Sequence, residues 1–178
     1  FIIFVAHVPE NTWTLWIPAR FGFSDATEIF VFCSGMASAI AFGGTFARHG
    51  WWMGTARTLH RVWQVYWAHI GLFFLTVALL VLFNGFGTGV VYTERLYVLP
   101  LFENTASALF GLMTLTYVPN YFDILPMYLV ILLMMPIVVG LARLSPLVAM
   151  AAVGALWLVA TTGFVDLPAE PWGDRTWF

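Results

Sequence analysis

Long apolar runs are the feature that most limits how this chain can fold. A scan for runs of roughly 17 to 25 residues, the length that crosses a bilayer core as a helix, finds four stretches: residues 25–46, 62–83, 124–141 and 147–162. Hydrophobic residues make up 61% of the 178 residues and charged residues only 9%, far outside the composition of soluble globular domains. The chain is therefore predicted to be an integral membrane protein.

A fifth, shorter helix is predicted before the first of these runs. Residues 1–8 are apolar up to His7, but they are too few to cross a bilayer, and they carry no basic region of the kind that opens a signal peptide. We expect them to be the end of a helix that begins upstream. The predicted fold class is all-α: a polytopic transmembrane helical bundle of about five helices with the first one truncated, forming a single membrane domain over residues 1–178.

The arginines predict which connections face the cytoplasm. Four of them lie in two of the connections between the apolar runs: Arg48, Arg57, Arg61 and Arg143. Because basic residues concentrate in cytoplasmic loops, these two connections, residues 47–61 and 142–146, are predicted to be cytoplasmic. The second of them contains ARLSP, which is so short that the flanking helices are expected to form a tight hairpin. Residues 9–23 and 84–123 then face outward.

The long outer connection, residues 84–123, contains the apolar stretch TASALFGLMTLTYVP. This stretch is about half as long as a bilayer core requires, so it predicts an interfacial or re-entrant helix. Backbone at membrane depth is tolerated only against protein or a water-filled cavity, which makes the connection a candidate wall or lid of an outward-facing pocket. The alternative is a loop helix that simply packs on the bundle.

Three ionisable residues at the outward ends of the first two helices are candidates for catalysis. His7 ends the first apolar run, and a neutral imidazole can accept a proton from a hydroxyl group or carry an acyl group, which suits acyl transfer. Asp25 and Glu28 are three residues apart, so they share a helix face and can orient an imidazole. The alternative is structural: a histidine bonded at a helix end, and carboxylates that stabilise a helix N-terminus.

A second cluster lies in the sequence RTLHRVWQVYWAH. Arg57 and Arg61 are four residues apart, with His60 beside them, so both guanidinium groups project from one side of a helix and can grip a phosphorylated ligand. The alternative is that the arginines only set the topology and contact anionic lipid headgroups. His69, two turns further along, is interpreted as a histidine that hydrogen-bonds to a neighbouring helix.

The aromatic segment 117–122 is accompanied by two polar residues, Asn120 and Asp123. Aromatic residues at the end of an apolar helix are typical of the interfacial belt of a membrane protein. Because these rings stand beside Asn120 and Asp123 on the predicted outer face, stacking on a sugar is the alternative interpretation. The two polar residues are therefore candidates for binding a substrate.

Cysteine and charge exclude several other classes of protein. Cys33 is the one cysteine and stands inside an apolar run, so the sequence predicts no internal disulfide, no thiolate cluster and no metal site. The 7 basic residues are all arginine and are spread over the chain, which does not predict a nucleic-acid-binding surface.

Three stretches resemble one family of membrane proteins: HVPENTW followed by FGFSDATEIFVFCSGMASAIAFG, then RTLHRVWQVYWAH, and YFDILPMYLVILLMMP. They resemble the OpgC-type proteins, which are related to the acyltransferase-3 superfamily of bacterial inner-membrane O-acyltransferases, and the resemblance covers most of the chain. Members of this group have about twice this length and roughly ten helices. The resemblance therefore implies that residues 1–178 are the N-terminal half of such a protein.

The resemblance implies an O-acyltransferase of the bacterial inner membrane that moves an acyl group, expected to be succinyl, from cytoplasmic acyl-CoA to a hydroxyl of a periplasmic glucan. It implies that His7 is the acyl-transfer histidine and that Arg57 and Arg61, with His60 beside them, bind the acyl-CoA donor. The alternative is a structural or accessory transmembrane subunit that packs against a larger membrane complex through small-residue helix faces, without catalysis. The expected partners are the lipid bilayer, the glucan and, in the alternative, other transmembrane subunits.

Overall fold

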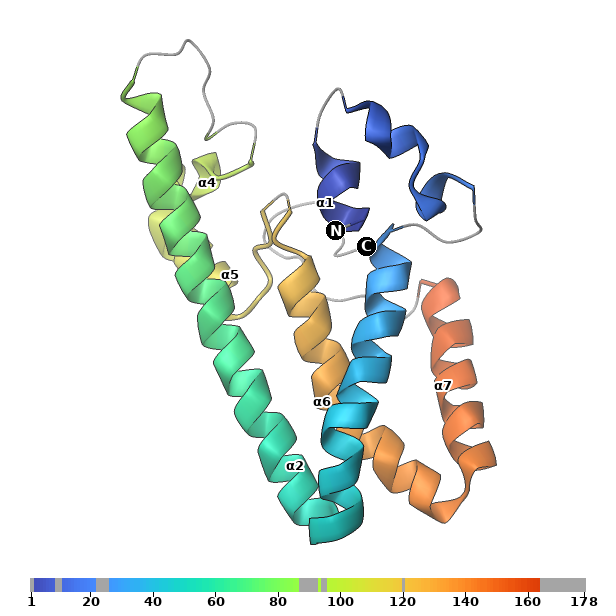
Figure 1. Ribbon diagram of the computed structural model, residues 1–178. Helices are drawn as coiled ribbons and strands as arrows, with labels where there is room; N and C mark the ends of the chain where they lie inside the picture. The colour runs from blue at the N-terminus through green and yellow to red at the C-terminus, as the bar shows by residue number, and fades with distance from the viewer. Residues whose placement is uncertain are drawn as a thin grey trace. The chain divides into compact units, whose positions relative to one another are not determined.

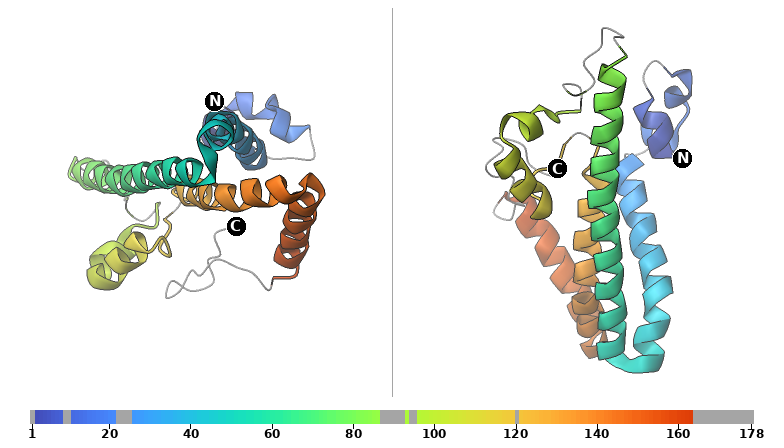
Figure 2. Two further views of the ribbon diagram at one scale, coloured as in Figure 1. Left: turned by 90° about the horizontal axis from the view of Figure 1, so that it is seen from below. Right: turned by 90° about the vertical axis from the view of Figure 1, so that its left-hand side faces the viewer.

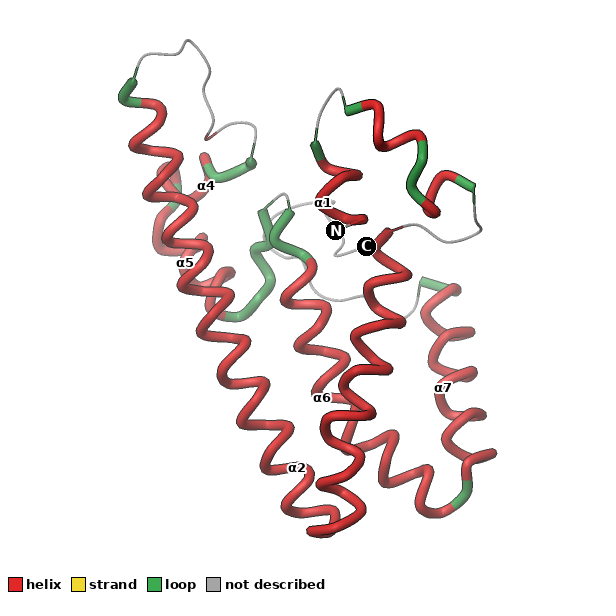
Figure 3. Tube along the Cα trace, in the orientation of Figure 1, coloured by secondary structure: helices red, strands yellow, loops and turns green. Residues whose placement is uncertain are grey.

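The regular elements of this protein are helices throughout the part of the chain that its computed structural model describes, which is residues 2–8, 11–21, 26–86, 93, 96–119 and 121–163 (Figure 1 and Figure 3). The predicted all-α class is confirmed for these residues. Two of the helices are long and apolar enough to cross a membrane, and a third apolar helix, Pro146–Thr161, is shorter. The prediction of about five spans is thus met in part.

The N-terminal unit, Phe1–Gly54, begins with three short helical elements: α1 (Ile2–His7), η1 (Thr12–Leu15) and η2 (Pro18–Arg20). Asn11 connects the first two. Its side-chain oxygen accepts a hydrogen bond from Trp13 N at 2.9 Å, which caps η1, and its side-chain nitrogen donates to Val5 O at 3.3 Å. One polar side chain thus ties the start of η1 to the backbone of α1.

Gly50 interrupts α2 (Ala26–Asn84), which is helical on both sides of it. Gly50 has φ 82° and ψ 175°, a combination that is essentially confined to glycine. Four residues to either side, Phe46 and Gly54 approach so closely that a Cβ on Gly54 would collide with the Phe46 ring. The bend therefore depends on two glycines, one that turns the chain and one that makes room for an aromatic ring.

This bend corrects the predicted connection between the first two full runs. The sequence predicts a loop over residues 47–61, whereas the structure has helix there except at Gly50. The apolar run stops at Phe46, but the polar residues that follow are ordinary helix formers, so the helix continues beyond it. A change in polarity indicates where a helix leaves apolar surroundings and not where it ends.

Among its described residues, the second unit, Thr55–Phe178, contains the rest of α2 and the helices α4 (Leu99–Glu103), α5 (Thr105–Met113), α6 (Ile124–Leu144) and α7 (Pro146–Thr161). α6 and α7 lie side by side as a hairpin (Figure 1). Ser145 alone separates them: its backbone is extended, its Oγ accepts from Leu147 N at 3.3 Å, and Pro146 opens α7. The tight hairpin predicted from ARLSP is confirmed.

α5 is the short apolar helix predicted in the connection after α2. It has 9 residues, about 14 Å of helix rise, which is half the thickness of a bilayer core. Two hydrogen bonds fix its segment against α2: Asn84 Nδ2 donates to Thr93 Oγ1 at 3.2 Å, and Tyr66 Oη donates to Met113 O at 2.7 Å. About 27 Å of helix rise separates Tyr66 from Asn84. The segment therefore runs back along most of the apolar length of this part of α2, as Figure 2 shows.

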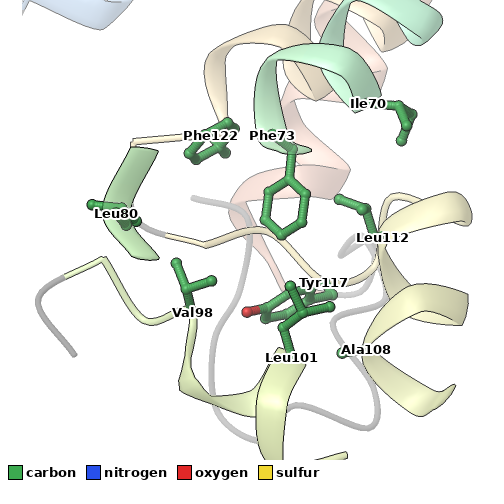
Figure 4. Close-up of a cluster of buried hydrophobic side chains, with 9 residues drawn as sticks. All are labelled: Ile70, Phe73, Leu80, Val98, Leu101, Ala108, Leu112, Tyr117 and Phe122. Carbon is green, nitrogen blue, oxygen red and sulfur yellow. The ribbon is translucent and has the colours of Figure 1, made fainter. Parts of the chain in front are cut away.

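The ring of Phe73 is the centre of the packing between this segment and α2. It is fully buried and meets Phe122 and Tyr117 edge-on, with ring centroids 5.5 Å and 6.2 Å apart. Edge-on aromatic pairs contribute about 0.5 to 1.5 kcal/mol each beyond burial. Figure 4 shows the surrounding cluster of buried side chains: Ile70, Phe73, Leu80, Val98, Leu101, Ala108, Leu112, Tyr117 and Phe122.

We expect Gly50→Ala to lower the free energy of unfolding by about 1 to 3 kcal/mol, because alanine is strained at this φ and ψ. Gly71→Ala is the matched control: Gly71 lies within α2, an added Cβ there has no atom within 4 Å, and alanine is the better helix former. Thermal unfolding of both variants in the same detergent measures the difference. An unchanged unfolding temperature for Gly50→Ala would contradict the role given to this glycine.

Candidate functional site

Four polar side chains gather in the second unit near the start of its part of α2. Arg57, His60, Arg61 and Gln64 are all exposed. Gln64 connects two of the others: its Oε1 accepts from Arg61 Nη1 at 3.3 Å, and its Nε2 lies 3.3 Å from His60 Nε2. An amide nitrogen only donates, so this contact assigns the acceptor role to His60 Nε2 and the ring proton to Nδ1. The predicted cluster of Arg57, His60 and Arg61 therefore includes a fourth member.

Aromatic rings follow these polar residues on the next turn of α2. Trp63 and Trp67 are exposed and meet edge-on with centroids 5.6 Å apart, and Tyr66 lies between them in the sequence and contacts both rings. Tryptophan and tyrosine side by side are typical of the membrane–water interface. The basic residues and the aromatic residues thus occupy successive turns of one helix, as the membrane interpretation requires.

His69 lies two turns beyond Arg61 on the buried face of α2. Its side chain is fully buried, and its ring meets Phe122 edge-on with centroids 6.1 Å apart. Neither ring nitrogen has a hydrogen-bond partner among the residues that the structure describes. The interpretation of His69 as a residue that hydrogen-bonds between helices is therefore wrong for this part of the chain, because an aromatic ring stands where a polar partner was expected.

The segment between α5 and α6 brings its aromatic residues to α2. Tyr117 and Phe122 are buried in the cluster around Phe73, so they do not provide an open surface for a sugar, whereas Tyr121 is 62% exposed. Asp123 is half-buried at the first position before α6, where its side chain makes no capping hydrogen bond. Asn120 lies outside the described residues. Sugar binding by Asn120 and Asp123 stays a prediction, with Tyr121 as the ring that is exposed.

The predicted catalytic residues belong to the N-terminal unit. His7 is the last residue of α1, and its side chain lies outside the described part of the structure, as does Asp25. Glu28 is exposed in the first turn of α2. That position agrees with both interpretations of the sequence, the catalytic one and the helix-terminus one. The expected approach of Asp25 and Glu28 to His7 stays a prediction.

A comparison with protein families identifies the family of the whole chain. The family model described as OpgC protein matches residues 1–178. The chain belongs to the OpgC family. The resemblance inferred from the three quoted stretches is thus confirmed, and membership of the OpgC family agrees with the two helices that are long and apolar enough to span a membrane. Comparisons with curated proteins and with solved structures found no match.

Two contacts in this OpgC-family chain were not predicted from the sequence: those of Gln64 with Arg61 and His60, and that of Phe122 with His69. Gln64 is four residues after His60 and three after Arg61, and this helical spacing was sufficient to find it. Phe122 gave no such signal, because it meets His69 through the folding of the segment between α5 and α6. A partner distant in sequence is set by tertiary packing, which the pattern along one helix does not contain.

We expect Tyr117→Phe to loosen the backbone around Tyr97. The Tyr117 hydroxyl donates a hydrogen bond to Tyr97 O at 2.8 Å, and such a bond contributes about 0.5 to 1.5 kcal/mol. Backbone amides of residues 96–101 should then exchange faster with deuterium. Tyr66→Phe is the matched change at Met113, and faster exchange is expected around residues 111–116 instead. Mass spectrometry of peptides reports both regions, and identical profiles for the two variants would contradict separate anchors.

Proposed function

We propose that this OpgC-family chain acts in O-acyl transfer at the bacterial inner membrane, where it moves an acyl group, succinyl, from cytoplasmic acyl-CoA to a hydroxyl of a periplasmic glucan. The observation that carries the proposal is the family match over residues 1–178. The polar cluster on α2 adds physical support, because the exposed guanidinium groups of Arg57 and Arg61 suit the phosphate groups of an acyl-CoA donor.

Arg57 and Arg61 are the proposed binding residues for the phosphate groups of acyl-CoA. A guanidinium group presents paired N–H donors that match phosphate oxygens, and it stays charged at any physiological pH. Gln64 holds the Arg61 guanidinium through Oε1 and faces His60 through Nε2. The donor site proposed from the sequence as Arg57, His60 and Arg61 thereby gains Gln64 as a positioning residue.

His7 is the proposed general base. It accepts the proton of the glucan hydroxyl while the hydroxyl oxygen attacks the thioester carbonyl carbon. The new C–O bond forms and the C–S bond breaks, so the electron pair leaves with the CoA sulfur, which takes up a proton. Transient acylation of His7 is the other route to the same ester. Asp25 and Glu28 are proposed to orient the His7 ring, and Asn120 and Asp123 to bind the acceptor.

An accessory role is the second candidate function, and one observation favours it. All residues of α7 except Ala149 are exposed, although this helix of 16 residues is apolar. A helix with no polar face needs lipid or another transmembrane chain around it. In this second role the chain is a structural subunit of a larger membrane complex and catalyses no transfer.

Arg61→Ala is expected to weaken binding of CoA by about 1.5 to 3 kcal/mol, roughly tenfold or more, since it removes a charge-assisted hydrogen bond to phosphate. Arg143→Ala is the control, because Arg143 is also an exposed arginine, in the last turn of α6. Isothermal titration of both purified variants with CoA compares them. Equal losses of CoA affinity in the two variants would mean that Arg61 acts only through the charge of the protein and makes no specific contact with the phosphate groups.

The transfer reaction itself is tested with labelled succinyl-CoA and periplasmic glucan in membranes that contain the full-length protein. His7→Ala is expected to abolish transfer, because no other group is proposed to accept the hydroxyl proton. His49→Ala, at an exposed histidine of α2, should leave transfer unchanged. Full activity of His7→Ala would remove His7 from the mechanism, and absence of transfer by the wild-type protein would favour the accessory role.

A further inference from the structure

His69 is a buried polar group that the proposed transfer mechanism does not use. Its side chain has no solvent exposure, and both of its ring nitrogens lack a hydrogen-bond partner among the described residues. The hydroxyl of Thr55 is the other buried side-chain group without a partner in these parts of the chain. A polar group that loses water without gaining a partner costs free energy. The two ring nitrogens of His69 are therefore available to hydrogen-bond a group of a ligand.

The surroundings of His69 limit what this ligand group can be. Val65 and Phe73, four residues before and after it on the same face of α2, are buried and apolar, and Phe122 covers the ring edge-on. Apolar walls disfavour a charged group that has no paired counter-charge. A sugar ring has several hydroxyl groups that each need a partner, whereas a neutral imidazole has one donor and one acceptor. A single carbonyl oxygen fits these walls best, and the carboxylate at the far end of a succinyl group has to lie outside them.

The distance from the polar cluster matches the donor. His69 lies about 12 Å of helix rise beyond Arg61 and about 18 Å beyond Arg57. The pantetheine arm of CoA, which leads from the phosphates to the thioester, is about as long as five extended residues, roughly 17 Å. A donor whose phosphates are held at the arginines thus carries its thioester to the level of His69.

We propose that the protonated ring nitrogen of neutral His69 donates a hydrogen bond to the thioester carbonyl oxygen of the acyl donor, an inference that rests on the proposed acyltransferase function. The imidazole of His69 keeps its single N–H proton throughout the reaction and forms no covalent bond. The hydrogen bond strengthens as negative charge develops on the carbonyl oxygen during attack by the hydroxyl group. His69 is then a catalytic residue, distinct from the proposed base His7.

Phe122 is the side chain that must move to admit the carbonyl. It belongs to the non-helical segment between α5 and α6, in which Leu115 and Tyr121 have positive φ values of 60° and 70°. Non-glycine residues are strained in this region of φ, and such strain often accompanies a ligand-dependent change of conformation. Movement of the Phe122 ring away from His69 is therefore the change that this segment has to permit.

The test compares two ligands that differ only at the carbonyl: succinyl-CoA and its thioether analogue, in which a methylene group replaces the thioester carbonyl. Affinities are measured by isothermal titration with the full-length wild-type protein and with His69→Phe and His69→Gln. The wild-type protein should bind the thioester about tenfold more tightly than the thioether. His69→Phe should bind both equally, and His69→Gln, which keeps an N–H donor, should retain part of the preference. Unacylated CoA should bind all three proteins alike, which also verifies that the variants are folded.

Three results would overturn the inference, and they separate it from the proposed function. If CoA binds but the wild-type protein does not distinguish thioester from thioether, or if folded His69→Phe retains the full preference, the donor site stands and the role of His69 falls. If His69→Phe does not fold, a full and undiminished preference in folded His69→Gln has the same meaning. If none of the proteins binds CoA, the proposed donor site itself is wrong, and the role of His69 falls with it.

Discussion

The packing of the segment around α5 against Phe73 is the interaction on which the rest of the second unit depends. Non-helical backbone beside a helix long and apolar enough to cross a membrane requires partners for its polar groups, because lipid offers none. Thr116 N and Tyr117 N both donate to Gly111 O, at 2.8 Å and 3.0 Å, so the end of α5 satisfies its own backbone. Phe73 then supplies the apolar surface that holds Tyr117 and Phe122. Without the Phe73 ring, Tyr117 and Phe122 would lose the aromatic contact that holds them against α2.

Elements whose signal is local follow from the sequence, and contacts between distant segments do not. α6, α7 and the turn between them are predicted because two apolar runs are separated by the short stretch ARLSP alone. The family follows from short stretches in the same way. The bend at Gly50 is missed because a single glycine in a polar stretch is compatible with either a loop or an interrupted helix. For His69, the sequence predicts that another segment packs beside it, but it does not predict that the neighbour is Phe122, which reaches His69 by tertiary packing.

Part of the candidate site likewise follows from short-range spacing in the sequence. The i, i+3 and i, i+4 spacing places Arg57, His60, Arg61 and Gln64 together on any regular helix, and the structure adds the two contacts through Gln64. The proposed approach of Asp25 and Glu28 to His7 has a different basis, since it requires two helices to pack in one particular way. Spacing along the chain does not determine that packing.

The position of His69 also bears on where the proposed transferase would hold the thioester. Thioesters hydrolyse, so a transferase that opens to water on one side benefits from holding the carbonyl where water is excluded. His69 is sealed by Phe122 in this structure, and the same apolar walls that leave its nitrogens unpaired strengthen any hydrogen bond that later forms there. In this proposal, Leu115 and Tyr121 are the strained residues of the segment that carries Phe122, and Phe122 moves away from His69 when the acyl donor binds.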